Sequence, residues 1–383
     1  MIYLDYASAT PIDDAVLDVM QPYWQDKFYN PSGLYRVSRE VKRELQQARE
    51  VAAKAIGAQA HEVYFTAGAT EANNLAIAGI TRQYPEGKAV ISQIEHDAVR
   101  RVANSSADTH DVEIDAGGRI DMEALSRAID DETVLVSIEH VNSEIGTIQP
   151  LRRIAALIAD VRSSRHERGV ELPIYLHTDA SQALDALSFN VEALGVDLAT
   201  INGAKIYGPK QSGLLYVRKG IELAPLLQGG SQERGIRAGT ENVAFAAGVA
   251  KALELAVEKR GERQKHYASL QSKLLDDIDN TSGVELNGGR KHRLASNINL
   301  SAKGLDGEML LHYMDAQGVQ VATGAACTAN YDSPSHVLTA LGLDEESIQG
   351  SLRLSFGRNT TEPDVKKASE ILFNLIEKLR PSQ

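Results

Sequence analysis

A lysine and an aspartate each follow an apolar, strand-like run. Lys205 lies in INGAKIYGPKQSG, directly after DLATI, where Gly203, Gly208 and Pro209 predict a tight loop. Asp179 ends the run PIYLHTD. Ligands of open α/β sheets gather where the strands end, so we expect the Asp179 carboxylate at that edge of a sheet. A desolvated amine can form a Schiff base, and an acid can keep a ring nitrogen protonated.

Further residues could complete such a site. Gly68, Ala69 and Thr70 open the helix-like ATEANNLAIAGI, and a helix N-terminus with free N–H groups and a hydroxyl suits a phosphate. His96 follows the strand-like ISQIE and could stack on a ring, while Gln182 could reach a phenolic oxygen. Pyridoxal 5'-phosphate (PLP) needs this combination of lysine, acid and phosphate donors.

Each of these residues also has an ordinary interpretation. Lysines are seldom buried, so Lys205 alone would be read as a surface residue. Asp179 could cap the following helix. His96 could be a histidine satisfied by its neighbours. The combination and order of the motifs favour the cofactor site.

The motifs GATEANN, EHDAV, VNSEIGTIQP, HTDASQA, KIYGPK and RGIRAGTEN resemble those of the class V aminotransferase family, and specifically its cysteine desulfurases. The match runs from LDYASATP to LSFGRNTTEPD. The resemblance implies that His96 stacks on the PLP ring, Asp179 pairs with the ring nitrogen and Lys205 forms the Schiff base. The cofactor-binding residues that it implies are Ala69, Thr70, His96, Asp179, Gln182, Asn202, Lys205 and Thr240.

The resemblance also concerns the quaternary structure. In such enzymes the RxGTxN segment reaches the phosphate bound by the neighbouring subunit. Arg237 and Thr240 occupy this segment, so we expect a homodimer.

Cys327 is the single cysteine of the chain, in VATGAACTANYDSPSHVLTALGL. A lone cysteine is often a small buried hydrophobe, but the polar, glycine-containing surroundings favour an accessible loop. The segment resembles the catalytic loop of long-loop cysteine desulfurases, which carries a persulfide. The implied reaction uses Lys205 to remove the α-proton of L-cysteine and the Cys327 thiolate to attack its sulfur. Alanine and a persulfide result, and the sulfur passes to an iron-sulfur scaffold or a tRNA-thiolation relay.

The carboxylate of such a substrate needs an anchor. The resemblance places Arg353 of GSLRLSFGRN in this role, through a bidentate pair, whereas Arg358 is expected to be structural. Asn30 of YNPSG and Asn142 of VNSEIG are further substrate-binding candidates, although Asn30 could simply form a turn. The catalytic residues are thus expected to be Cys327, Lys205 and His96, and no residue is assigned to a metal.

The chain departs from the family pattern near the expected site. Asn202, Gly203, Ala204 and Lys205 stand where Ser-Gly-His-Lys is usual, and Ala204 cannot replace an imidazole donor. Ser143 replaces the second Asn of Asn-Asn-Glu-Ile-Gly, and Tyr35 a common histidine. The alternatives are therefore a divergent class V PLP enzyme similar to selenocysteine lyases, or a weakly active or non-catalytic sulfur-transfer scaffold.

Strand-like and helical patterns alternate through most of the chain. They predict an α/β fold, with a large PLP-binding domain over residues 15–255 and a mostly parallel, seven-stranded type of sheet covered by helices. Residues 1–14 and 256–383 are expected to form a smaller α+β domain with the Cys327 loop. A helical stretch from about 242 to 277 could connect the two domains.

The overall composition fits this prediction. The 383 residues carry a formal charge of −12, so no direct nucleic acid or membrane partner is expected. A single cysteine permits no intramolecular disulfide, and no signal peptide or membrane-spanning run is evident. We expect a cytoplasmic protein with small-molecule or protein partners.

Overall fold

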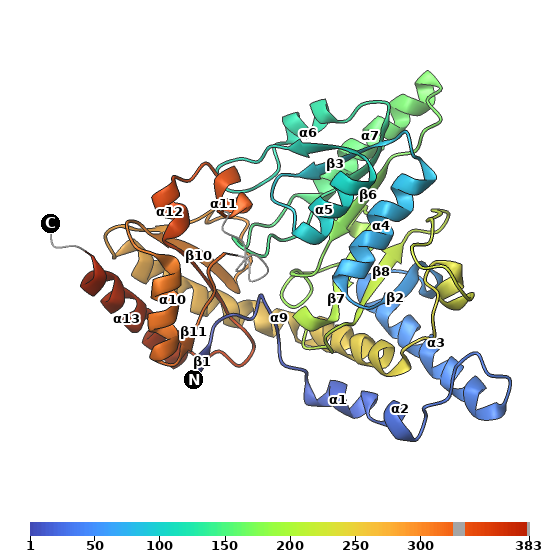
Figure 1. Ribbon diagram of the computed structural model, residues 1–383, viewed down its shortest axis with the longest axis horizontal. Helices are drawn as coiled ribbons and strands as arrows, with labels where there is room; N and C mark the ends of the chain where they lie inside the picture. The colour runs from blue at the N-terminus through green and yellow to red at the C-terminus, as the bar shows by residue number, and fades with distance from the viewer. Residues whose placement is uncertain (325–333, 381–383) are drawn as a thin grey trace.

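The computed structural model describes residues 1–324 and 334–380 (Figure 1). Cys327 and its predicted catalytic role therefore lie outside the described residues. Figure 1 shows a larger group of strands and helices, a smaller group near the two chain ends, and the long helix α9 extending between them.

The larger sheet has seven strands in the order β2-β8-β7-β6-β5-β3-β4. They are β2 (Val63–Thr66), β8 (Gly213–Val217), β7 (Leu198–Asn202), β6 (Tyr175–Asp179), β5 (Thr133–Ser137), β3 (Lys88–Ser92) and β4 (Asp108–Val112). Only β8 runs against its neighbours. Both β5 and β8 are buried at every residue, as strands are when both faces are covered. The predicted α/β fold with a mostly parallel sheet is confirmed.

Helices lie before and between the strands of this sheet along the chain. They are α1 (Asp14–Met20), α2 (Pro22–Gln25), α3 (Arg36–Ile56), α4 (Ala69–Gln83), α5 (Asp97–Ser106), α6 (Met122–Ala128), α7 (Leu151–Arg168) and α8 (Val191–Leu194). Of these, α4 contacts β2, β5, β6, β7 and β8, and most of its side chains are buried. Within the described parts of the chain, no helix is both long and apolar enough to cross a membrane.

Helix α9 (Val243–Asp279) is the longest element, with 37 residues. It begins where the Asn242 side chain accepts a hydrogen bond from Phe245 N, and its bounds agree with the predicted stretch within two residues. The helix contacts α1, α3 and α13 (Glu362–Leu379). The predicted boundary between residues 255 and 256 falls inside it.

The C-terminal part contains two small sheets. Its remaining elements are β1 (Ile2–Tyr3), β9 (Val284–Leu286), β10 (Asn297–Ala302), α10 (Gly307–Ala316), β11 (Val319–Gln320), α11 (His336–Ala340), α12 (Glu345–Gln349) and β12 (Ser351–Ser355). β12, β10 and β9 form an antiparallel sheet, and β1 pairs in parallel with β11. The start of the chain thus packs with the C-terminal part, which is the expected arrangement, while the domain boundaries stay a prediction.

Candidate active site

A cavity of about 220 Å³ lies where the parallel strands of the large sheet end. Eight residues predicted from the sequence line it, namely Ala69, Thr70, His96, Asp179, Gln182, Asn202, Lys205 and Arg353. They come from the last residues of β6 and β7, from the segments that follow β2, β3, β6 and β7, and from β12. Because these strands of the large sheet are parallel to one another, their carboxyl ends meet at one edge.

Lys205 ends a short turn directly after β7. Its Nζ donates to the carbonyl oxygens of Ala7 at 2.7 Å and Ser8 at 2.6 Å. The turn is fixed from the N-terminal segment, because Thr10 Oγ1 donates to Ala204 O and accepts from Tyr207 N. The tight loop predicted around Lys205 therefore exists, and it directs the lysine into the cavity.

The turn also requires unusual backbone geometry. Tyr207 has a φ of +64°, in the left-handed region that side chains disfavour. Two guanidinium groups lie over its ring, that of Arg358 at 4.2 Å from the ring centroid and that of Arg263 at 5.2 Å. Arg358 also pairs with Asp13 and does not line the cavity. These contacts support the structural role expected for Arg358.

Asp179 ends β6 with both carboxylate oxygens engaged. Asn73 Nδ2 donates to Oδ2 at 2.7 Å, and Ser181 N donates to Oδ1 at 2.9 Å. The second bond is the local turn contact that the capping interpretation anticipated. The first comes from α4 and orients the carboxylate within the cavity wall.

His96 and the start of α4 supply other parts of the wall. His96 Nδ1 accepts a hydrogen bond from Ala98 N at 3.0 Å, so the proton of the neutral ring is on Nε2. Gly68 precedes α4 with a φ of +102°, a conformation that glycine adopts at little cost. Ala69 and Thr70 follow with the first N–H groups of the helix beside the cavity.

Arg353 is 2% exposed and contacts three acceptors. Its Nη2 donates to Asp5 Oδ1 at 2.6 Å and to Ser8 Oγ at 2.7 Å, and its Nη1 donates to Ser143 O at 3.2 Å. Its Nε is buried without a partner among the described residues. A guanidinium group on the cavity wall suits an anionic ligand.

A group of buried acids near the cavity was missed by the sequence reading. Glu139 follows β5, lines the cavity and accepts from Asn142 Nδ2 at 2.7 Å. Burial, together with the nearby Asp179 carboxylate, raises the pKa of Glu139 to about 8, against the opposing effects of the Asn142 hydrogen bond and of His96. Glu95 accepts from Glu139 N, and burial together with Glu139 raises the pKa of Glu95 well above the usual range. The signal was present, since Glu139 directly follows the apolar run TVLVSI.

Two substrate-binding candidates lie away from this cavity. The Asn142 amide is buried, donating to Ile94 O and Glu139 Oε1 and accepting from Glu144 N and Ile145 N. It has no group left for a ligand, and its neighbour Ser143 lines the cavity instead. Asn30 is exposed and accepts from Ser32 N at 2.9 Å. This hydrogen bond is the kind of contact expected if Asn30 simply forms a turn.

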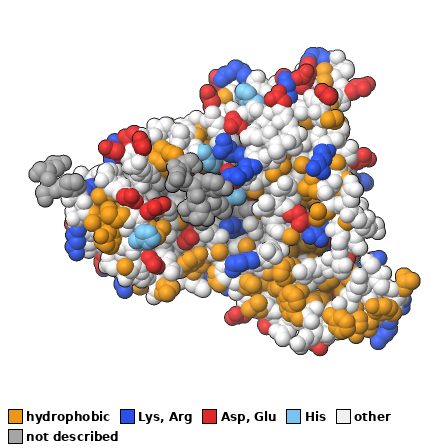
Figure 2. Space-filling view, in the orientation of Figure 1, with side chains coloured by type: hydrophobic (Ala, Val, Ile, Leu, Met, Phe, Trp, Pro, Cys, Tyr) orange, Lys and Arg blue, Asp and Glu red, His pale blue; other side chains and the backbone are white. Residues whose placement is uncertain are grey.

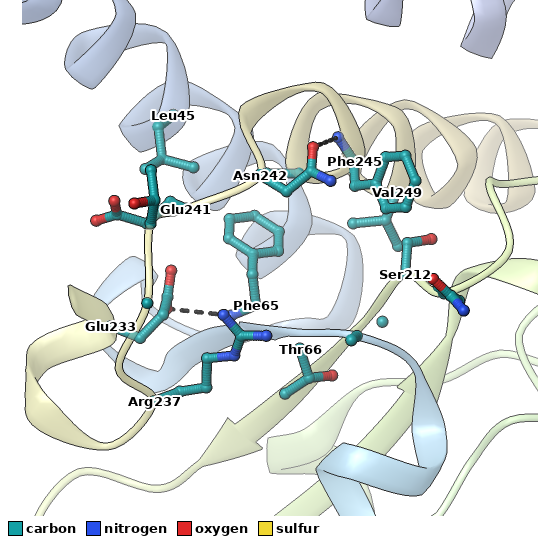
Figure 3. Close-up of a pocket in the computed structure, with 16 residues that line it drawn as sticks. Leu45, Phe65, Thr66, Ser212, Glu233, Arg237, Glu241, Asn242, Phe245 and Val249 are labelled. Carbon is teal, nitrogen blue, oxygen red and sulfur yellow. Dashed lines mark hydrogen bonds between the residues drawn. The ribbon is translucent and has the colours of Figure 1, made fainter. Parts of the chain in front are cut away.

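Thr240 and Arg237 line a second cavity of about 280 Å³ (Figure 3). Arg237 pairs with Glu71 at 2.7 Å, and the cavity wall continues to Phe65, Glu233 and the start of α9. Within one chain, Thr240 does not line the Lys205 cavity. The described residues therefore form two separate walls, one around Lys205 and one around the RGIRAGTEN segment.

Comparisons with known proteins agree with this arrangement. Residues 2–368 match the family model described as aminotransferase class-V. Among curated proteins, "Cysteine desulfurase IscS" of Dictyoglomus turgidum is 40% identical, covering 99% of this chain and 95% of the relative. The enzyme of the same name from Methanosarcina thermophila is also 40% identical, over 99% and 93% of the two chains.

Solved structures give the same result. A "NIFS-LIKE PROTEIN" superposes with a TM-score of 0.89 at 31% identity, covering 99% of this chain and 100% of that one. A structure described as "SspA in complex with cysteine" has a TM-score of 0.78 at 33% identity, covering 93% and 99%. With a family match over nearly the entire sequence and relatives at this identity, the chain belongs to the aminotransferase class-V family, in its cysteine desulfurase group.

Proposed function

We propose that this protein is a PLP-dependent cysteine desulfurase that converts L-cysteine to L-alanine and transfers the sulfur to an acceptor protein. The observation that carries the proposal is the single cavity shared by Lys205, Asp179, His96 and Arg353. The names of the curated relatives support the reaction, and the neighbour described in complex with cysteine supports the substrate.

The residues of the cavity fit PLP. Asn73 and Ser181 line it, and Asn73 Oδ1 and Ser181 Oγ are buried without a hydrogen-bond partner among the described residues. Such atoms are rare in folded proteins, so a polar ligand is expected beside Asp179. Lys205 would hold the cofactor covalently, Asp179 would face its ring nitrogen, and Gln182 its phenolic oxygen. Ala69, Thr70 and Asn202 would bind the phosphate. When bound, PLP supplies an electron sink for the bonds of the substrate α-carbon.

The protein side chains would orient the substrate and move its protons. Arg353, which lines the cavity, would bind the α-carboxylate. Lys205 Nζ would accept the α-proton, and the contacts to Ala7 O and Ser8 O would hold the resulting ammonium group. His96 would cover the ring and share in proton transfer.

Cys327 would receive the sulfur. Its thiolate attacks the substrate sulfur, a sulfur–sulfur bond forms, and the carbon–sulfur bond breaks with its electron pair remaining on the carbon fragment. Protonation of that fragment yields alanine, and Cys327 becomes a persulfide. The acceptor would be an iron-sulfur scaffold or a thiolation relay, docking near the Cys327 segment because the persulfide must reach it.

A homodimer would complete the site. Several large apolar side chains of α1, α2 and the following loop are exposed, namely Leu17, Trp24, Phe28, Leu34 and Tyr35. Figure 2 shows hydrophobic side chains gathered over this region. Exposed apolar area of this kind marks interaction surfaces, and a second copy would bring Arg237 and Thr240 to the phosphate of its neighbour.

The test compares three proteins incubated with L-cysteine and a reductant, namely wild type, Cys327→Ala and Lys205→Ala. Alanine and sulfide are quantified, and the visible absorbance is recorded before and after PLP addition. We expect both products from wild type alone. Borohydride reduction followed by mass mapping should locate the cofactor on Lys205. Full activity of Cys327→Ala would disprove the persulfide step, and a wild-type protein that binds no PLP would disprove the enzyme assignment.

A further inference from the structure

The segment Asp5–Ser8 lies between the two cationic side chains of the cavity. On one side its main-chain carbonyl groups, Ala7 O and Ser8 O, accept hydrogen bonds from Lys205 Nζ. On the other side its side-chain oxygens, Asp5 Oδ1 and Ser8 Oγ, accept hydrogen bonds from Arg353 Nη2. Ser8 therefore contacts Lys205 with its carbonyl group and Arg353 with its hydroxyl group.

This segment is held firmly by the C-terminal part of the chain. Leu4 N donates to Gln320 O, and Leu4 O accepts from Ser355 N at 2.7 Å. Ala7 N donates to Ser355 Oγ at 2.9 Å, while Ser8 Oγ donates to Asp5 Oδ1 at 2.8 Å. Since the segment is anchored on both sides of Asp5, the acceptors that it offers to Arg353 have fixed positions.

The charge of Arg353 makes these acceptors important. A buried guanidinium needs a counter-charge, and Asp5 supplies it through an ion pair of 2.6 Å between Arg353 Nη2 and Asp5 Oδ1. The Arg353 side chain is 2% exposed and the Asp5 side chain 17%. Nη2 is engaged by Asp5 and Ser8, whereas Nε is left without a partner. The two residues thus fix the orientation of the planar guanidinium group, which lines the cavity.

We propose that Asp5 and Ser8 are positioning residues for Arg353, and that they make the cavity select an α-amino acid over a simple amine. This inference rests on the proposed function, in which Arg353 binds the substrate carboxylate. Without the Ser8 hydroxyl or the Asp5 charge, the flexible arginine side chain loses its fixed orientation, and pre-organisation for a carboxylate is lost.

The experiment uses a pair of ligands that differ only in the carboxylate, L-alanine and ethylamine. Dissociation constants are measured from the visible spectrum of PLP-loaded wild type, Ser8→Ala, Ser8→Thr and Asp5→Asn. Ser105→Ala, at an exposed position on α5, is the matched control. Kinetics with L-cysteine give KM and kcat separately.

For Ser8→Ala and Asp5→Asn we expect about 10-fold weaker L-alanine binding, as for loss of a hydrogen bond to a charged group. Ethylamine binding should change less than about 2-fold. KM for L-cysteine should rise in parallel while kcat changes little, and Ser8→Thr, which keeps the hydroxyl, should restore L-alanine binding.

Equal changes for L-alanine and ethylamine, or no change for either, would overturn the inference. If Asp5→Asn fails to fold, Ser8→Ala decides the question, because it removes only one hydroxyl and leaves the main-chain carbonyls in place. The ligand titrations require no turnover. They therefore test the role of Asp5 and Ser8 even if wild type proves unable to release sulfur, which would count against the proposed function alone.

Discussion

The side-chain amide of Asn73 donates a hydrogen bond of 2.7 Å to Asp179 Oδ2, joining helix α4 to the end of strand β6. Asn73 is fully buried, and Ser181 N holds the other oxygen of the same carboxylate. The direction of the Asp179 carboxylate is therefore fixed from two elements. A functional group supported in this way keeps its geometry before a ligand arrives.

Replacement of Asn73 by alanine should weaken PLP binding by at least about 10-fold, because a hydrogen bond to a charged group is lost within a buried site. Titration of the cofactor-free protein with PLP, followed by visible absorbance, measures this change. Asn104→Ala, on the exposed face of α5, is the control and should bind like wild type. Equal affinities for Asn73→Ala and Asn104→Ala would contradict the orienting role.

The positions of three expected site residues follow from strong local signals. Asp179 ends a buried strand, Lys205 and His96 follow buried strands, and parallel strands bring such positions together. The register within the VNSEIG turn could not be read in the same way. Asn142 faces inward to the acids, and Ser143 faces the cavity, because adjacent residues of a turn point in different directions.

Other elements lacked a readable pattern. Strand β4, with the sequence DTHDV, was not predicted because it has one apolar residue and forms the edge of the sheet. The separation of Thr240 from the Lys205 cavity depends on how distant segments pack. Neither the spacing of residues nor their propensities encode that relationship.

Glu139 should make the stability of the cofactor-free protein fall as pH rises. Burial raises its pKa to about 8, above the ordinary value near 4.5 expected in the unfolded chain. Between these values the folded state binds more protons than the unfolded state, so the free energy of unfolding decreases with increasing pH. The groups that act on Glu139 electrostatically are Asp179, His96 and Glu144. Glu95 is buried as well, and Glu139 contributes to raising the pKa of Glu95.

The uncharged variant Glu139→Gln tests this dependence. Its gain over wild type should be small near pH 5 and on the order of a few kcal/mol near pH 8, measured by urea unfolding at both values. Glu123→Gln is the control, because the Glu123 side chain is 91% exposed. A gain for Glu139→Gln that is the same at both pH values would show that Glu139 is charged throughout.

Two glycines of α9 should respond in opposite ways to alanine. Gly261 is exposed, and a Cβ there would have no neighbour within 4 Å, so Gly261→Ala should stabilise the protein by about 0.5–1 kcal/mol. At Gly248 a Cβ would lie 2.7 Å from Met20 Sδ and 3.1 Å from Pro209 Cγ. Gly248→Ala should therefore destabilise by about 1 kcal/mol or more. Thermal unfolding of both variants measures these changes. If both proteins are stabilised, Met20 and Pro209 can move aside to accommodate a Cβ at position 248.

Arg49 and Glu233 support the backbone at the start of the RGIRAGTEN segment. The two side chains form a buried bidentate pair, at 2.7 and 2.8 Å. Glu233 also accepts a hydrogen bond from Phe65 N (Figure 3). Glu233 and Arg234 have φ values of +44° and +56°, so this pair holds a strained backbone in place directly before Arg237.

Removal of one partner from a buried pair leaves an uncompensated charge, and Glu233→Ala should cost about 3 kcal/mol in the free energy of unfolding. If the strained backbone presents Arg237 and Thr240 to a second subunit, the dissociation constant of the homodimer should also rise at least about 10-fold. Sedimentation equilibrium measures the second effect and urea unfolding the first. Glu254→Ala, which breaks an exposed pair with Lys251, should change neither quantity appreciably. A Glu233→Ala protein that is less stable but dimerises like wild type would contradict a role of this ion pair in the subunit interface. The segment would then keep its conformation without the ion pair.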